Sequence, residues 1–159
     1  GRLVLVYPGS DIDGSRPFSR RHRVELGGRR GFVRLALRSQ APIVPVVSAG
    51  THEQFIVLRR GDRVARWLGG QRRLRVAVFP VVLSLPWGLT SGFFPYLPLP
   101  AQTTVAFGAP IRFPGLGPEA ADDPAAVAAC YRLVEERMQA LLDELHRGRR
   151  LLLGQPRRP

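Results

Sequence analysis

The sequence has one cysteine and one methionine among its 159 residues, and it contains neither lysine nor asparagine. A single thiol, that of Cys130, excludes an intramolecular disulfide framework and a multi-cysteine zinc site, and we interpret it as a packing residue. The sequence opens at Gly1 inside an apolar run, and no initiator methionine, signal peptide or targeting segment is recognisable. We therefore expect the chain to be a fragment whose beginning lies elsewhere.

Histidine, the usual general base near neutral pH, is also scarce. His22, His52 and His146 are the three present, and none has a Ser or Cys nucleophile and a carboxylate in a recognisable local arrangement. No pair of histidines has the spacing of metal ligands, so we expect no metal site. We interpret His146 as a cation that helps to cap a helix C-terminus, and His22 and His52 as surface or hydrogen-bonded structural residues.

Positive charge is abundant and unevenly distributed. All 24 basic residues are arginines, against 12 acidic residues, which gives a net charge of +12. The absence of lysine points to a GC-rich coding bias, so the number of arginines says less than their placement. Residues 1–75 hold 16 arginines and 5 acidic residues, whereas residues 76–159 hold 8 and 7. An anion-binding surface is therefore expected in the first half of the chain.

The first half predicts a strand, a helix and a second strand. Residues 3–7 (LVLVY) form a β-branched and aromatic run before Pro8-Gly9, which predicts a buried strand and a turn. Residues 29–38 place apolar and arginine side chains on different faces at helical spacing. The continuous apolar run of residues 42–47 is typical of a strand buried on both faces in a parallel sheet, so the three elements predict a right-handed βαβ unit.

The second half predicts short helices over residues 53–69 and further strands at residues 74–79 and 103–107. A long amphipathic helix follows Asp123, which provides an N-cap before a proline at the first helical position, and it should end near Gly148.

A composition of 45% apolar and 23% charged residues is that of a globular protein, and the length suits one domain. We expect a mixed α/β fold, with a mainly parallel sheet flanked by helices, incomplete at its N-terminus. Residues 1–148 would form the C-terminal portion of a single domain, and residues 149–159 a frayed basic tail.

One long segment carries no charge at all. Residues 76–111 are uncharged across 36 positions, but prolines interrupt them so often that a spanning helix of about 20 residues cannot form. Its large apolar side chains either insert at a membrane interface or pack inside the domain. They are Trp87, Phe93, Phe94, Tyr96 and Leu97.

The loop of residues 9–28 is better suited to ligand binding than to a mere connection, because it is long and rich in arginine. A glycine after a strand lets a ligand approach the backbone at the edge where open α/β sheets bind ligands. Asp11 and Asp13 add carboxylates that can orient arginines or accept a substrate hydroxyl, and guanidinium groups suit phosphate. An ordinary turn with solvated charges is the alternative.

Five motifs, in order, resemble one family. They are Y-P-G-S-D-I-D-x-x-R-P (residues 7–17), G-G-R-R-G-F-V-R-L-A-L (27–37), A-P-I-V-P-V-V (41–47), L-P-W-G-L (85–89) and P-L-P-A (98–101). The series resembles the glycerolipid and lysophospholipid acyltransferase superfamily, most nearly its bacterial members related to the diacylglycerol acyltransferase branch. The resemblance covers residues 3–147 and implies an acyltransferase-type α/β sandwich.

The resemblance implies that the first motif, usually F-P-G-G-x-x-E or F-P-E-G-T-R in the family, helps to form the acyl-acceptor pocket. Ser10 replaces a family glycine, and Asp13 stands where one variant has glutamate. The implied acceptor-binding residues are Tyr7, Pro8, Gly9, Ser10, Asp11, Asp13 and Arg16, with candidate phosphate contacts at Arg20, Arg29 and Arg30 and a pocket wall at Pro42 and Pro45.

The family's catalytic motif, H-x-x-x-x-D, is absent from this sequence. In the family its histidine removes the acceptor hydroxyl proton and its aspartate orients that histidine. Five places after the three histidines stand Gly27, Val57 and Leu151. The family motif precedes the strand that opens this chain, so we expect an enzyme of which this part, with no catalytic residue of its own, is inactive alone.

The implied reaction moves a fatty acyl group from an acyl thioester, either acyl-CoA or acyl carrier protein, to a hydroxyl of a glycerolipid or lysophospholipid, without a bound cofactor. The implied partners are these two substrates and a membrane surface, at the cytoplasmic face of a bacterial membrane. Charge alone leaves another class open, a non-catalytic basic module that binds anionic membrane surfaces or nucleic acid. We find no recognition helix or zinc finger and expect no nucleic acid.

Overall fold

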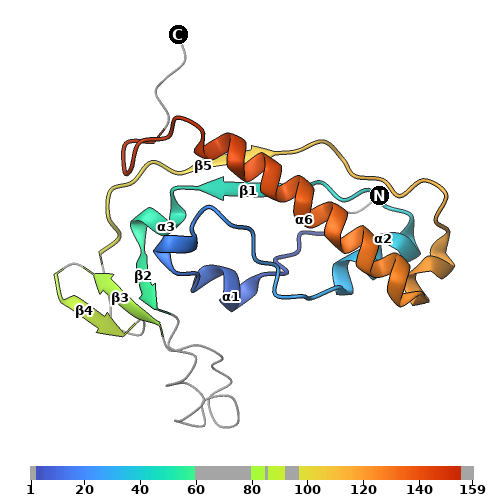
Figure 1. Cartoon of the computed structure of the whole chain (residues 1–159), viewed down its shortest axis with the longest axis horizontal. Helices are drawn as coiled ribbons and strands as arrows, with labels where there is room; N and C mark the ends of the chain where they lie inside the picture. Colours follow the sequence, from blue (N-terminus) through green and yellow to red (C-terminus); the bar gives the residue numbers. More distant parts are fainter. Residues whose placement is uncertain (1–2, 60–79, 85, 92–96, 155–159) are drawn as a thin grey trace, which may run out of the picture.

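The computed structural model describes residues 3–59, 80–84, 86–91 and 97–154, and one long helix runs along its main body (Figure 1). In chain order its elements are α1 (Ser10–Gly14), the 3-10 turn η1 (Phe18–Arg20), α2 (Gly31–Ser39), β1 (Val46–Ala49), α3 (Thr51–Gln54), β2 (Ile56–Arg59), β3 (Val81–Ser84), β4 (Gly88–Ser91), β5 (Thr104–Phe107), the 3-10 turn η2 (Pro118–Asp122) and α6 (Pro124–His146).

Helix α6 confirms the long amphipathic helix predicted after Asp123. The Asp123 carboxylate accepts a hydrogen bond of 2.8 Å from the backbone N–H of Ala125, which satisfies one of the free donors at the helix start. Its first half packs with α2, η2 and Leu26 in one core cluster. The fully buried side chains of that cluster include Val33, Leu37 and Val127.

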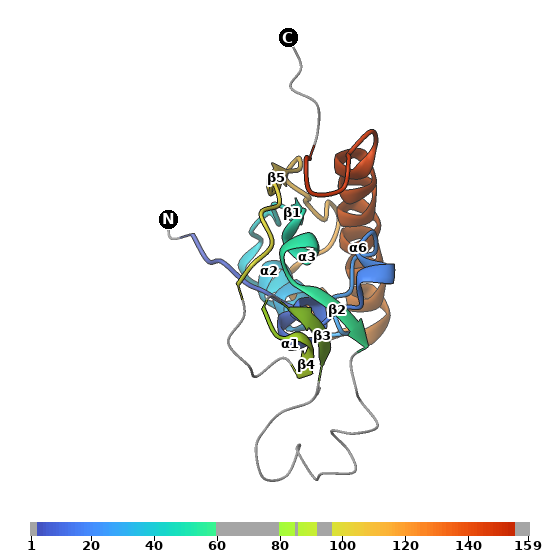
Figure 2. The same ribbon diagram turned by 90° about the vertical axis from the view of Figure 1, so that its left-hand side faces the viewer.

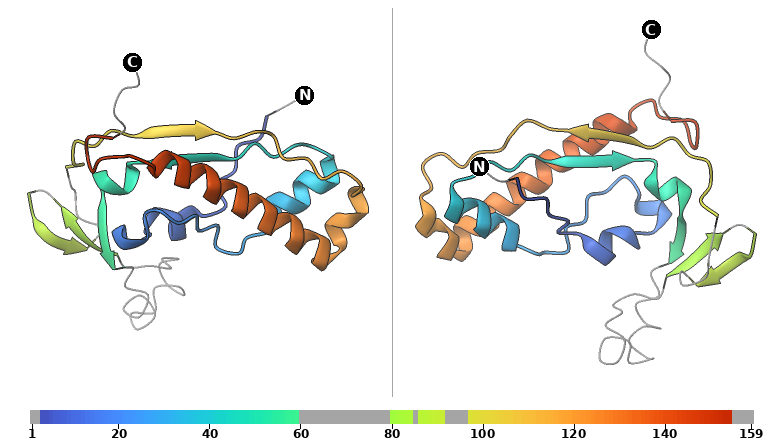
Figure 3. Two further views of the ribbon diagram at one scale, coloured as in Figure 1. Left: turned by 45° about the horizontal axis from the view of Figure 1, so that its top comes forward. Right: turned by 180° about the vertical axis from the view of Figure 1, so that it is seen from behind.

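Strands β1 and β5 pair antiparallel and lie along α6 (Figure 3). Val47 and Ala49 of β1 pack with Leu142 and Leu145 of α6, whereas Ser48, on the opposite face, is exposed. The mainly parallel sheet and the βαβ unit predicted from the sequence are therefore wrong. Strand β1 is covered on one face only, so the apolar run of residues 42–47 does not mark a strand buried on both faces. Its partner β5 lies much later in the chain and runs antiparallel to it.

A second antiparallel sheet has the order β2-β3-β4 and lies at one end of the molecule (Figure 1). Strand β2 begins two residues after α3, where the sequence predicted only helices, and β3 and β4 form a hairpin that the sequence did not predict. The strand predicted at residues 74–79 lies outside the described residues. No helix in the described part of the chain is both long and apolar enough to cross a membrane.

Residues 3–7 do not form the buried strand that the sequence predicted. They are extended and lead away from the body of the molecule, and no described strand pairs with them (Figure 2). Leu3 is 94% exposed and Tyr7 77% exposed. Local β propensity favoured a strand here, but a strand also needs a pairing partner, and none of the described strands provides one.

The arginine-rich loop of residues 9–28 is ordered by contacts to α6. Gln139 donates from Nε2 to the carbonyl of His22 (2.7 Å) and accepts at Oε1 from the N–H of Val24 (2.8 Å). The Tyr131 hydroxyl accepts from the N–H of Gly28 at 3.2 Å. Leu26 is buried in the core between these two anchors. The loop is therefore fixed in one conformation on the long helix.

We predict that Gln139→Ala loosens this loop, because two backbone groups lose their partner at once. The expected loss in the free energy of unfolding is about 1–2 kcal/mol, and hydrogen exchange in residues 22–28 should accelerate more than in α6 itself. Glu136→Ala, at an exposed position of the same helix, is the control. Unchanged exchange in residues 22–28 would show that Gln139 does not hold the loop.

Candidate functional site

A groove of about 370 Å³ lies where the extended N-terminal segment meets the start of α2. Its wall is mainly apolar and it has one charged side chain, that of Arg29, whose Nη1 donates to the carbonyl of Pro8 at 3.3 Å. The lining residues are Val6, Tyr7, Pro8, Arg29, Gly31, Phe32 and Leu35. The structure thus brings Tyr7 and Pro8, from the first motif, together with Arg29 from the second.

Gly9 and Ser10 form the tight turn that follows this groove. The carbonyl of Gly9 accepts from the N–H groups of Ile12 and Asp13, at 3.1 and 3.2 Å. A Cβ atom on Gly9 would lie 2.7 Å from the carbonyl oxygen of Glu25, so only glycine fits. Ser10 has a φ of +45°, in the left-handed region that favours glycine, which is the residue the family has there. The serine is accommodated at a conformational cost.

Arg16 points into the protein and does not line the groove. It is 4% exposed, its Nη1 lies 3.3 Å from Oδ1 of Asp13, and its Nη2 donates to Nε2 of His52 at 2.6 Å. Its Nε has no hydrogen-bond partner within the described part of the chain. Contact between Arg16 and an acceptor stays a prediction, and in this structure its partners are protein groups.

The remaining predicted residues are dispersed. Arg20 faces Glu25 at 3.8 Å, Arg30 is exposed at the N-cap of α2, and Asp11 lies in α1. Pro42 is exposed, and Pro45 is buried with its carbonyl accepting from the N–H of Gly108 at 2.8 Å. Arg20, Arg30, Pro42 and Pro45 do not line the groove.

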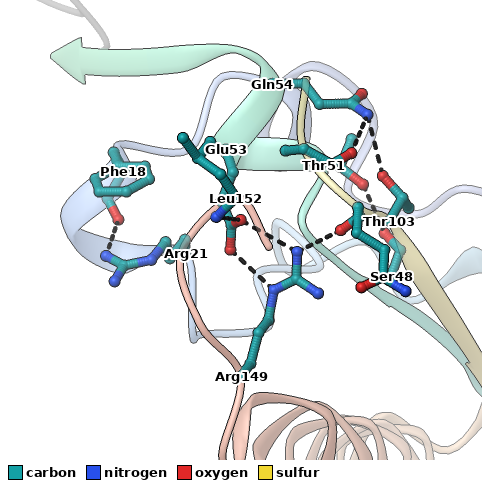
Figure 4. Close-up of polar contacts among 11 residues, drawn as sticks. Phe18, Arg21, Ser48, Thr51, Glu53, Gln54, Thr103, Arg149 and Leu152 are labelled. Atoms are coloured by element: carbon teal, nitrogen blue, oxygen red, sulfur yellow. Dashed lines mark hydrogen bonds and ion pairs between the residues drawn. The ribbon is translucent and has the colours of Figure 1, made fainter. Parts of the chain in front are cut away.

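A buried ion pair joins α3 to the segment after α6 (Figure 4). Glu53 accepts from Nε and Nη2 of Arg149, at 2.9 and 3.1 Å, and from the N–H of Leu152 at 2.8 Å. Both side chains are nearly inaccessible, at 3% and 2%. Burial alone would raise the pKa of the Glu53 carboxyl, but the hydrogen bonds from Arg149 and Leu152 outweigh burial and hold that pKa below its usual range.

No local pattern indicates this pair, because its members lie 96 positions apart in the sequence. Arg149, which we placed at the start of a frayed tail, is in fact anchored, and residues 155–159 lie outside the described residues. Phe32 and Leu35 of the groove were also missed as site residues. Leu35, an exposed apolar residue among the arginines of α2, is the one local signal that could have found them.

The histidines are held neutral by their surroundings. Burial lowers the pKa of His52 to about 4, and the charge of Arg16 adds to this effect. Burial also lowers the pKa of His146 to about 4, with further contributions from His22 and Arg149. The rings of His22 and His146 meet edge to face at 4.1 Å, and burial lowers the pKa of His22 as well. The interpretation of His146 as a helix-capping cation is therefore wrong at neutral pH.

These shifts predict a loss of stability in mild acid. Between pH 6.5 and about 4 the unfolded chain protonates His52 and His146 while the folded chain does not, so stability is complete above pH 6.5 and falls as the pH is lowered through this window. Urea unfolding at several pH values should show this slope, and His146→Gln should flatten it. Glu144→Gln, at an exposed position, is the control and should keep the pH dependence of the parent. If His146→Gln also keeps it, the low pKa of His146 does not contribute to the acid sensitivity.

Comparison with known proteins gives one family. The family model for diacylglycerol acyltransferases matches residues 1–149. An uncharacterized protein of Mycobacterium tuberculosis is 33% identical over 150 residues, which cover 94% of this chain and 39% of that protein. A protein of Mycobacterium leprae is also 33% identical, over 94% of this chain and 38% of its own length.

Human diacylglycerol O-acyltransferase 2 is 25% identical over 118 residues, 73% of this chain and 30% of the human protein. No solved structure matches the chain. The chain spans about two-fifths of the length of the mycobacterial relatives. The family match covers nearly all of the sequence, including both motifs that form the groove, and the chain belongs to the diacylglycerol acyltransferase family.

Proposed function

We propose that this chain supplies the acceptor-binding part of an O-acyltransferase, and that the groove between Pro8 and α2 receives the acceptor lipid. The groove carries the proposal, because it joins two family motifs in one place and combines an apolar wall with a single guanidinium group. An amphiphile such as a glycerolipid or a lysophospholipid has the matching chemistry, an alkyl chain beside a polar head.

In the proposed reaction the acceptor hydroxyl oxygen attacks the carbonyl carbon of an acyl thioester. The new C–O bond forms, the C–S bond breaks, the thiolate leaves, and a general base takes the hydroxyl proton. The donor is acyl-CoA or an acyl carrier protein. No histidine of this sequence has aspartate five places later, and the pKa values of His52 and His146 are too low for an efficient base near neutral pH.

We therefore propose that none of the three histidines of this chain is the base and that the chain alone is inactive. Its contribution is positional: holding the acceptor against the thioester can supply several kcal/mol of the barrier. The anchored loop suits that task, because it does not have to be ordered again when the lipid binds.

Two substitutions in the full-length protein test the groove. Leu35→Asp places a charge on its apolar wall, and Arg29→Gln removes its guanidinium group; both positions are exposed, so the fold should tolerate them. Each should raise the KM for the acceptor about tenfold, since 1.4 kcal/mol corresponds to a factor of ten, and should leave the KM for the thioester unchanged.

The matched controls are Leu153→Asp and Arg34→Gln, an exposed leucine and an exposed arginine that do not line the groove. If the control variants raise the KM for the acceptor as much as the groove variants do, the groove is not the acceptor site.

The proposal includes a membrane surface as partner, and the β3–β4 hairpin is the described element best suited to meet it. Trp87 is 60% exposed and Leu89 67% exposed, at the end of the molecule away from α2 (Figure 1). Leu97 is also exposed, whereas Phe93, Phe94 and Tyr96, which the sequence placed in the same cluster, lie outside the described residues. Exposed tryptophan and leucine side chains are typical of interfacial anchors.

We predict that Trp87→Ser/Leu89→Ser weakens flotation of the full-length protein with anionic liposomes, because apolar area is lost from the lipid contact. The control is Phe107→Ser/Leu153→Ser, which removes two equally exposed apolar side chains elsewhere. Equal flotation of the two double variants would argue against the hairpin as the contact.

A further inference from the structure

The short helix α3 connects three distant parts of the chain through three consecutive side chains. Nε2 of His52 accepts from Arg16 in the loop, Glu53 accepts from Arg149 after α6, and Nε2 of Gln54 donates to the carbonyl of Ala101 at 3.0 Å. A helix of four residues cannot hold its own position, because it has too few internal hydrogen bonds. These three side-chain contacts, together with the flanking strands β1 and β2 and the hydrogen bond from the N–H of Leu99 to the carbonyl of Gln54, hold α3 in place.

The Glu53 contact is the firmest of the three. Its carboxylate accepts three hydrogen bonds, and Nη2 of Arg149 donates as well to the carbonyl of Gln102. A Cβ atom at Gly50 would collide with both Arg149 and Gln102, so the residue that precedes α3 has to be glycine for the arginine to fit. Removing one partner of a buried ion pair leaves the other charge uncompensated, which is strongly destabilising at that point.

The His52 contact connects α3 to the arginine-rich loop. Nε2 of His52 accepts the hydrogen bond from Arg16, so the ring is neutral and carries its proton on Nδ1. The other end of the Arg16 guanidinium faces Asp13. The backbone N–H of Asp13 donates in turn to the carbonyl of Gly9, in the turn next to the groove. A continuous path of contacts thus runs from Arg149 to the Pro8–Gly9 turn.

We propose that Glu53 and Arg149 are positioning residues for the acceptor groove, which they stabilise through His52 and Arg16 without touching the lipid. This rests on the proposed function of the groove. It assigns Arg149, shortly after the end of α6, to the working site. It also gives the buried Arg16 a role as the link between α3 and the loop.

The test uses the full-length protein and the variant Arg149→Gln, with Arg150→Gln, an exposed neighbour, as the control. The KM for the acceptor should rise about tenfold, as small misplacements of a binding group do, while the KM for the thioester stays constant. A merely structural role would raise both constants or lower only the amount of folded protein. Equal changes in the two KM values would overturn the proposal.

A double-mutant cycle tests the path itself. Arg16→Gln and Arg149→Gln should not be additive, because each interrupts the same series of contacts, so the combined variant should be no worse than Arg16→Gln alone. If the two substitutions instead multiply each other's effect on the acceptor KM, they act independently, and the proposed path of contacts is wrong. If Arg149→Gln does not fold, Glu53→Gln/Arg149→Gln takes its place, since it leaves no charge buried without a partner.

A readout independent of activity separates this proposal from the proposed function. Modification of His52 by diethyl pyrocarbonate, followed by mass spectrometry, reports whether its Nε2 is still engaged by Arg16. Labelling should increase several-fold in Arg149→Gln and stay constant in Arg150→Gln. Unchanged labelling overturns the path whatever the activity. Increased labelling together with normal acceptor kinetics in Leu35→Asp would support the path and reject the groove as the lipid site.

Discussion

The apolar stripe of α6 is the surface on which the other parts of the main body assemble. Helix α2 and η2 pack on its first half, and β1 packs on its second half. The arginine-rich loop crosses it between Tyr131 and Gln139. Burial of these side chains is the main stabilising term, and at roughly 25 cal/mol per Å² each large residue contributes on the order of 2 kcal/mol. The groove exists because α6 fixes both α2 and the loop beside it.

Charge has two different roles in the molecule. Most arginines of the described residues are exposed, and they favour anionic surroundings, as the net charge of +12 suggests. Arg16 and Arg149 are buried instead, each against a carboxylate. A buried ion pair adds little net stability because of its desolvation cost, but it specifies geometry. In this protein the geometry that it specifies is the position of α3, from which the loop next to the groove is oriented.

Local patterns predicted local structure well. Helices α2 and α6 and strand β5 were predicted close to where they lie, because side-chain periodicity and the Asp123 cap depend on neighbouring residues only. Pairing between distant segments could not be read in this way. Antiparallel pairing of β1 with β5 and the contact of Glu53 with Arg149 join residues that no periodicity relates. The apolar run at residues 3–7 was predicted as a strand from its composition, but no local pattern tells whether another strand pairs with it, and none of the described strands does.

The candidate site was predictable in part for the same reason. Tyr7 and Pro8 were named from the first motif and Arg29 as a candidate phosphate contact, and the structure places all three at the groove. Arg16 was named for its charge. Charge does not tell in which direction a side chain points, and in the structure Arg16 points inward. Phe32 and Leu35 were taken only as helix residues, because a helical pattern does not distinguish a core face from a groove.

Photo-crosslinking tests the central claim most directly. A lysophospholipid whose acyl chain carries a photoactivatable diazirine would be bound to the full-length protein, irradiated, and the labelled residues mapped by mass spectrometry. The account predicts labelling of Val6, Phe32 and Leu35, reduced by competition with unlabelled acceptor. Competable labelling confined to residues away from the Pro8–α2 groove would contradict it.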